Sequence, residues 1–184
     1  MAELHSSQTS CLRTVQQVKR VWISRKALNE LERNAEDKEP LETGGLLVGY
    51  FSEDDDDVVI TGLTGPGPKA KHGKCFFCPD YDGDRLEIGR IFAESFGKVS
   101  YLGDWHTHPT GSSYLSFLDR RALKNIAKFP HNYVDRPIML ILGKRGEERQ
   151  NQWTPCAWRI SPLSRRILGA RWRFASLDVK IFDI

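Results

Sequence analysis

Apolar residues in the first quarter of the chain change from an alternating to a helical spacing and back again. Residues 17–23 alternate loosely between apolar and polar side chains, which predicts a first strand. Ser24 could cap a helix over 25–37, where apolar residues recur three and four positions apart. We expect this helix to end before Pro40 and to bury Ala27, Leu28, Leu31 and Ala35. The apolar run 43–51 then predicts a buried strand that follows directly on Glu42.

The middle of the chain predicts a hairpin, a long loop and a second helix. The acidic run 53–57 separates the strand 43–51 from the apolar run 58–63, so we expect an exposed turn and a returning strand. Residues 64–82 are rich in Gly, Pro and Lys and predict a surface loop. A second helix ending at Gly97 is indicated by Leu86, Ile88, Ile91, Phe92 and Phe96.

The later elements lead into the stretch that carries the candidate chemistry. Residues 99–105 predict a strand that runs into His106, and a third helix is expected over 116–129. Residues 137–142 and 153–160 predict a hairpin, whereas the pattern beyond Ser161 assigns no element. The mixture predicts an α/β (α+β) fold.

Length and composition fit one compact domain. The chain has 184 residues, of which 40% are hydrophobic, and we assign 1–16 to a polar tail and 17–184 to the domain. No apolar run approaches the roughly 18 residues that span a bilayer. The first ten residues contain no apolar core of a secretory signal, so the cytoplasm is the expected location.

Charge and cysteine content narrow the function classes further. The net charge is only +3, and the four cysteines show no disulfide pattern, so we interpret them as reduced thiols. Basic and aromatic residues alternate near the C-terminus, which could bind nucleic acid but favours an amphipathic element that packs its aromatic side chains inward or contacts a partner. These residues are Trp158, Arg159, Arg165, Arg166, Arg171, Trp172, Arg173 and Phe174.

Two histidines at the end of the strand 99–105 form the candidate metal site. His106 and His108 are two residues apart, so on a strand their side chains project from the same face. Pro109 should end the strand, and the chain can then turn to bring Asp119 over the same point. Two imidazoles and one carboxylate, with a water in the fourth position, are the ligands of a catalytic zinc site.

A hydrolytic zinc site also needs an acid–base residue, and Glu42 is the candidate. Gly44 and Gly45 follow it and allow close backbone approach. Ser116 could donate a hydrogen bond to the oxyanion of a tetrahedral intermediate. Ser116 and Asp119 also fit a helix-capping box, and the two roles can coexist.

Taken together, Glu42 and the pattern His106-x-His108, seven residues, Ser116, two residues, Asp119 resemble the JAMM (MPN+) metalloprotease motif, with every position filled. The resemblance covers residues 18 to 160 and implies the MPN/JAB fold, a mixed sheet flanked by helices similar to cytidine deaminases. It also implies zinc ligation by His106, His108 and Asp119, catalysis by Glu42, and support from Ser116.

The same resemblance implies a substrate class. Family members hydrolyse the bond after the C-terminal glycine of ubiquitin-like proteins, and this chain is most similar to prokaryotic JAB proteins of antiphage and mobile-element operons. The implied partners are a ubiquitin-like protein, its conjugates, and activating and conjugating enzyme homologues. Two alternatives remain: a peptidase acting on a small sulfur-carrier protein, and a non-catalytic scaffold. The short interval between Asp119 and Pro137 leaves little room for the insertion that positions polyubiquitin chains, so linkage specificity is not carried over.

Other candidate residues have simpler interpretations. Cys75 and Cys78 with His72 would supply only three nearby zinc ligands, so we favour a loop with two thiols. Trp105 should point away from the metal face into the core. Asp104 shares the histidine face and is either a partner for an imidazole N–H or a solvated carboxylate. His5 and His131, which have no partner pattern, are expected at the surface.

Overall fold

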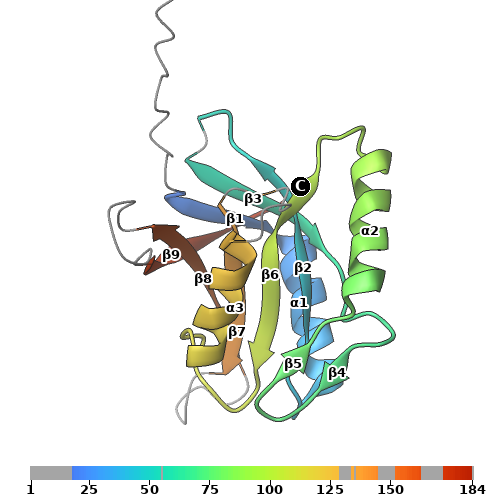
Figure 1. Cartoon of the computed structure of the whole chain (residues 1–184), viewed down its shortest axis with the longest axis vertical. Coiled ribbons are helices and arrows are strands. Elements are labelled where there is room, and N and C mark those ends of the chain that lie inside the picture. Colours follow the sequence, from blue (N-terminus) through green and yellow to red (C-terminus); the bar gives the residue numbers. More distant parts are fainter. Residues whose placement is uncertain are drawn as a thin grey trace, which may run out of the picture.

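The computed structural model is built around one mixed β-sheet closed into a barrel (Figure 1). It describes residues 18–54, 56–128, 134, 136–144, 152–162 and 172–183. Within these residues the strands follow the order β1-β3-β2-β6-β7-β8-β9 around the barrel. Their bounds are β1 Arg20–Ser24, β2 Gly44–Phe51, β3 Asp57–Leu63, β6 Ser100–His108, β7 Ile138–Lys144, β8 Trp153–Pro162 and β9 Trp172–Phe182. This architecture confirms the expected α/β (α+β) fold class.

Helix α1 (Arg25–Lys38) lies where its sequence pattern predicts. The Ser24 side chain accepts a hydrogen bond from the Ala27 N–H (3.2 Å), which satisfies one of the free donors of the first turn. The predicted stripe is buried: Ala27, Leu28, Leu31 and Ala35. It joins the larger of two hydrophobic clusters, in which Trp105 is 1% exposed, as expected for a residue facing away from the histidines.

Strand β6 lies between β2 and β7 in the barrel and carries the candidate ligands at its C-terminal end. It pairs antiparallel with β2, where His106 lies opposite Gly44, and parallel with β7, where His106 lies opposite Ile141. A second hydrophobic cluster covers this side of β7 and β8 with helix α3 (Phe117–Lys128). The register therefore brings the start of β2, the end of β6 and the start of α3 together.

Strand β9 closes the barrel, and the sequence pattern did not predict it. It pairs antiparallel with β8 and parallel with β1. Trp158 is buried, and Trp172 and Phe174 pack against the second cluster, so these aromatic side chains face inward. Arg165, Arg166 and Arg171 lie outside the described residues, as does the predicted tail over 1–16.

Two local expectations were wrong. The predicted loop 64–82 contains a two-stranded sheet of β4 (Lys71–His72) and β5 (Phe77–Cys78). The acidic run is not wholly solvated: Asp57 is 9% exposed and accepts hydrogen bonds from Arg20 Nε (2.8 Å) and Trp22 Nε1 (3.0 Å).

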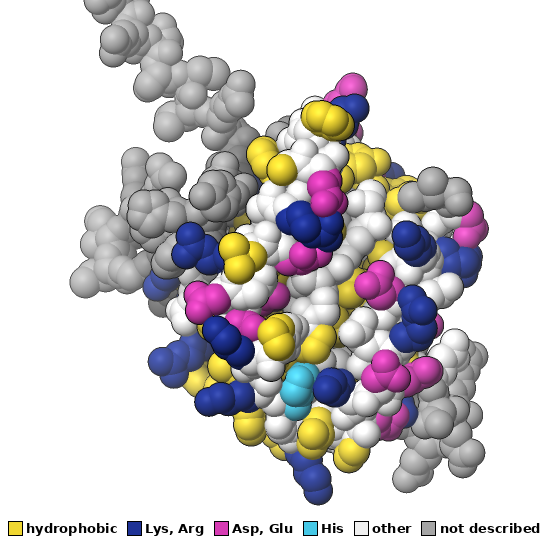
Figure 2. All heavy atoms as spheres, turned by 90° about the vertical axis from the view of Figure 1, so that its right-hand side faces the viewer, with side chains coloured by type: hydrophobic (Ala, Val, Ile, Leu, Met, Phe, Trp, Pro, Cys, Tyr) yellow, Lys and Arg dark blue, Asp and Glu magenta, His cyan; other side chains and the backbone are white. Residues whose placement is uncertain are grey.

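The second helix, α2 (Tyr81–Glu94), forms but does not bury the apolar residues that indicated it. Leu86 is 78% exposed and Phe92 51%, and on this side of the molecule hydrophobic side chains stand among charged ones (Figure 2). Its buried residue is Asp84, which lies against the sheet. No helix in the described parts of the chain is both long and apolar enough to cross a membrane.

Candidate metal centre

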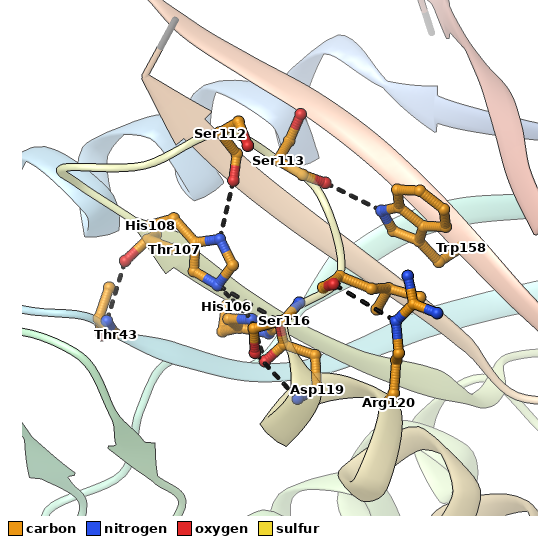
Figure 3. Close-up of polar contacts among 11 residues, drawn as sticks. Thr43, His106, Thr107, His108, Ser112, Ser113, Ser116, Asp119, Arg120 and Trp158 are labelled. Carbon is orange, nitrogen blue, oxygen red and sulfur yellow. Dashed lines mark hydrogen bonds and ion pairs between the residues drawn. The ribbon is translucent and has the colours of Figure 1, made fainter. Parts of the chain in front are cut away.

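The ends of β6 and α3 bring three ligand atoms together. Strand periodicity puts His106 and His108 on one face, and their Nε2 atoms lie 3.1 Å apart. Asp119 enters from the first turn of α3, with Oδ1 at 3.1 Å from His106 Nε2 and Oδ2 at 3.5 Å from His108 Nε2. One ligand atom from each residue lies within 4.8 Å of the others. Figure 3 shows the three side chains pointing toward one another. The predicted ligand set therefore converges at one point.

The loop between β6 and α3 fixes the tautomer of His108. Its Nδ1 lies 2.8 Å from the Ser112 carbonyl oxygen, which can only accept a hydrogen bond. A proton therefore resides on Nδ1, and in the neutral ring Nε2 keeps its lone pair for a metal ion. This contact is the one that metal-binding histidines usually make through their second nitrogen.

The charge balance of the cluster also suits a cation. Burial opposes ionisation of Asp119, but hydrogen bonds from His106 and His108 outweigh it and hold the pKa of this carboxyl well below its usual range. Burial likewise opposes protonation of His108, yet contacts with Asp119 and Ser112 raise the pKa of that imidazole. An anionic carboxylate beside two imidazoles is a fitting donor set for a divalent metal ion.

Ser116 and Asp119 cap the start of α3 reciprocally. The Asp119 N–H donates to Ser116 Oγ (3.2 Å), and the Ser116 N–H donates to Asp119 Oδ2 (2.7 Å). The capping interpretation is therefore confirmed, and the capping contacts hold the Asp119 carboxylate against the two histidines. A capping Ser116 uses an oxygen lone pair, so its O–H remains a donor.

Glu42 lies just before β2, beside the histidines. Its pKa is raised by burial, while the nearby charges of His108 and His106 lower it in part. The glycines after it permit the close approach that the sequence suggested. A Cβ on Gly44 would lie 2.4 Å from the Trp105 carbonyl oxygen, and one on Gly45 would lie 2.3 Å from the Thr64 carbonyl oxygen.

Thr107, which the sequence pattern did not single out, links the Glu42 segment to strand β6. It lies between the two histidines, points to the opposite face and is fully buried. Its Oγ1 accepts from the Thr43 N–H (3.0 Å) and its own N–H donates to the Thr43 carbonyl oxygen (2.8 Å), as Figure 3 shows in part. Its place between the two histidines of the His-x-His pattern was the sequence feature that could have identified Thr107.

Asp104 adopts neither of the two environments expected for it. It accepts a hydrogen bond from the Tyr101 hydroxyl (2.6 Å) within the fold, and burial raises its pKa to about 6. Asp84 approaches from α2, where burial also raises the pKa to about 6 and Thr64 Oγ1 lies 3.4 Å from its Oδ1. Asp104 also contributes to the raised pKa of Asp84, so the two carboxyls lie near each other between α2 and the sheet.

The hairpin cysteines are not part of this cluster. Cys75 and Cys78 are exposed free thiols on the β4–β5 hairpin. Among the described residues, His106, His108 and Asp119 are the group that meets the geometry of a metal site, so the hairpin cysteines do not form one with His72. His5 and His131 lie outside the described residues.

Comparison with known proteins finds a matching family and several relatives. Residues 24–160 match the family model described as prokaryotic homologues of the JAB domain. A probable metalloprotease of Sinorhizobium fredii is 36% identical over 82% of this chain and 88% of its own. A protein of Enterobacter hormaechei named CD-NTase/cGAS isopeptidase is 33% identical over 55% of each chain, and an Escherichia coli protein of the same name is 29% identical over 56% of this chain and 63% of its own.

A solved structure supports the fold. The solution structure of protein DSY2949 from Desulfitobacterium hafniense has a TM-score of 0.64 over 89% of this chain and 94% of that one, at 16% identity.

Proposed function

Because the chain belongs to the family of prokaryotic homologues of the JAB domain, whose relatives include metalloproteases and isopeptidases, we propose that it is a zinc-dependent isopeptidase. In this proposal it cleaves after the C-terminal glycine of a ubiquitin-like protein, either to release a conjugated protein or to process the tail. The observation that carries the proposal is the convergence of His106, His108 and Asp119 next to Glu42.

Zinc is the proposed metal, with His106, His108 and Asp119 as its ligands. Two imidazoles and a carboxylate are a common protein ligand set of catalytic zinc, and three ligands leave a position for water. When bound, zinc supplies a Lewis acid and lowers the pKa of a coordinated water to about 7. The contact of His108 with the Ser112 carbonyl oxygen orients the ring for this role.

Glu42 is the proposed general base. A carboxyl with a raised pKa can accept a proton from the attacking water and return it to the leaving amine. Ser116 is proposed to donate a hydrogen bond from its hydroxyl group to the developing oxyanion. Its oxygen accepts from the Asp119 N–H at the same time, so capping and catalysis use different parts of one hydroxyl group.

The substrate class rests on the family and on the names of two relatives. An isopeptide bond is favoured because both the Enterobacter and the Escherichia relatives are named isopeptidases. The ubiquitin-like protein, its conjugates, and activating and conjugating homologues encoded nearby are the proposed partners. Cytoplasmic antiphage or mobile-element pathways are the proposed setting. A peptidase acting on a sulfur-carrier protein is the alternative within the same chemistry.

The experiment is a cleavage assay on zinc-loaded protein. The probes are ubiquitin and a set of bacterial ubiquitin-like proteins, each carrying a fluorogenic amine on its C-terminal glycine. We expect release of the amine from at least one probe, and loss of release when that terminal glycine is replaced by valine. Tight binding of a probe without cleavage would replace the proposal with the scaffold alternative.

A further inference from the structure

The backbone around Glu42 is held by contacts from two different parts of the chain. Residues 41–43 precede β2 and form no strand, so the sheet itself does not fix the conformation of Glu42. A residue that transfers a proton must be held closely, because a misplacement of about 1 Å can cost roughly 100-fold in rate. The contacts that replace sheet pairing here therefore bear on catalysis.

The β4–β5 hairpin supplies one set of these contacts. The Glu42 N–H donates to the Gly73 carbonyl oxygen (2.8 Å), and His72 Nδ1 lies 2.9 Å from the Glu42 carbonyl oxygen. A carbonyl oxygen only accepts, so His72 Nδ1 carries the proton and donates it. Both backbone polar groups of Glu42 are thus bonded to consecutive residues of one hairpin.

Strand β6 supplies the other set. The peptide group that joins Glu42 to Thr43 has its oxygen bound by His72 and its N–H bound by Thr107 Oγ1 (3.0 Å). Thr107 lies between the two histidine ligands. This peptide plane is therefore fixed at one end by the hairpin and at the other by the metal-bearing strand.

The His72 ring is itself held in place. It lies opposite Phe77 in the hairpin, with ring centroids 5.5 Å apart and planes inclined by 41°. Phe77 in turn covers Gly44, where an added Cβ would come within 2.7 Å of two carbons of the Phe77 ring. The hairpin thus packs directly on the segment that carries Glu42.

We propose that His72 is a positioning residue that orients Glu42 by binding its carbonyl oxygen. This inference rests on the proposed role of Glu42 as the general base. It gives a function to a histidine that the sequence presented only as a weak companion of Cys75 and Cys78. In this role His72 acts through the backbone of Glu42, and it is not one of the proposed metal ligands.

Two replacements separate this role from packing. His72→Phe keeps a ring against Phe77 and removes the donor, whereas His72→Asn keeps an N–H donor near the position of Nδ1. With zinc-loaded protein and the fluorogenic ubiquitin-like probe, we expect His72→Phe to lower kcat by about 10- to 100-fold with little change in KM. His72→Asn should recover most of the loss, and zinc content should be unchanged in both.

A double-mutant cycle tests whether His72 acts through Glu42. In a Glu42→Gln background, His72→Phe should lower the remaining rate by less than about twofold, because the group it positions is already inactive. Multiplicative losses, or a His72→Phe rate equal to wild type, would overturn the inference and leave the proposed function intact. A Glu42→Gln variant as active as wild type would instead overturn the proposed role of Glu42 as the general base.

A measurement that does not depend on activity tests the positioning role of His72 separately from the proposed function. Hydrogen exchange of the Glu42 and Thr43 amides in zinc-loaded protein should speed up at least tenfold in His72→Phe and return toward the wild-type rate in His72→Asn. Unchanged exchange in His72→Phe would contradict the positioning role whether or not any probe is cleaved.

Discussion

Ser116 and Asp119 bond each other twice across the first turn of α3, each through its backbone N–H to the side chain of the other. The same Asp119 carboxylate faces His106 and His108. A structural cap and a proposed metal ligand are thus one side chain. The cap orients the ligand, so the start of α3 and the metal centre should respond together to substitution.

Ser116→Ala and Ser116→Gly form a pair that separates capping from catalysis. Ala at an N-cap costs about 1 kcal/mol of stability, whereas Gly costs only a few tenths. Both remove the hydroxyl, so both should lower kcat by about 100-fold or more if Ser116 supports the oxyanion. Urea unfolding and the cleavage assay measure the two effects. A Ser116→Gly variant with wild-type kcat would limit Ser116 to capping.

Zinc binding should depend on each of the three proposed ligands. Single replacements His106→Ala, His108→Ala and Asp119→Ala should each lose most of the metal, measured as zinc per chain after dialysis, from an expected value of about one. His72→Phe is the matched control, because it removes a histidine outside the cluster. Full zinc occupancy in a His106→Ala/His108→Ala protein would contradict the assignment.

Asp84 should make the protein less stable as pH rises. Burial raises the pKa of this carboxyl to about 6 from 3.8, so the folded state holds a proton that the unfolded chain releases near pH 4. The destabilisation is absent below about pH 4, develops as pH rises and is complete above about pH 6. Asp84→Asn should therefore be more stable than wild type by about 2 kcal/mol near pH 8 and equal to it near pH 4.

Asp82→Asn is the control for this effect. Asp82 is exposed in the same first turn of α2, so its replacement removes a similar favourable interaction with the helix dipole without relieving burial. Urea unfolding at both pH values gives the comparison. Lower stability of Asp84→Asn than of Asp82→Asn near pH 8 would show that the Asp84 charge is stabilised rather than penalised.

Two glycines should respond in opposite directions to alanine. Gly103 in β6 has φ of 145°, and a Cβ there would lie 1.9 Å from the Ile138 carbonyl oxygen, so Gly103→Ala should lose roughly 3 kcal/mol or fail to fold. Gly89 in α2 has open space around its Cβ position, so Gly89→Ala should gain about 0.5–1 kcal/mol. Thermal unfolding measures both; destabilisation by Gly89→Ala would mean that α2 packs more closely there.

The pattern of residues within a short segment was enough to predict helix α1 and the convergence of the two histidines of β6. Ser24 and the stripe of α1 define that helix by capping and periodicity, and His106 and His108 converge because strand side chains alternate. The contact of Asp119 with the histidines follows from a motif of fixed spacing. The sequence therefore named the members of the candidate centre, whereas the position of Glu42 beside them depends on the pairing of β2 with β6.

Long-range pairing was beyond the sequence pattern. Strand β9 pairs with β8, the strand that precedes it, and with β1 near the other end of the chain. Its residues from Leu177 to Ile181 alternate between apolar and polar, but this local pattern does not reveal the pairing with β1 that closes the barrel. The β4–β5 hairpin is short and is stabilised by contacts with Glu42 and Gly44, so composition alone suggested a loop. In α2, Leu86 and Phe92, which helped to indicate the helix, lie exposed, and the buried Asp84 had no signal in the sequence.

The cleavage rate of Glu42→Gln relative to wild type, on a ubiquitin-like probe that wild type cleaves, tests whether Glu42 is the general base. The amide nearly preserves the shape of the side chain but cannot accept the proton. We predict that kcat falls by about 10²- to 10⁴-fold while zinc content and unfolding free energy stay the same. Equal rates for the two proteins, each with full zinc, would show that Glu42 is not the general base.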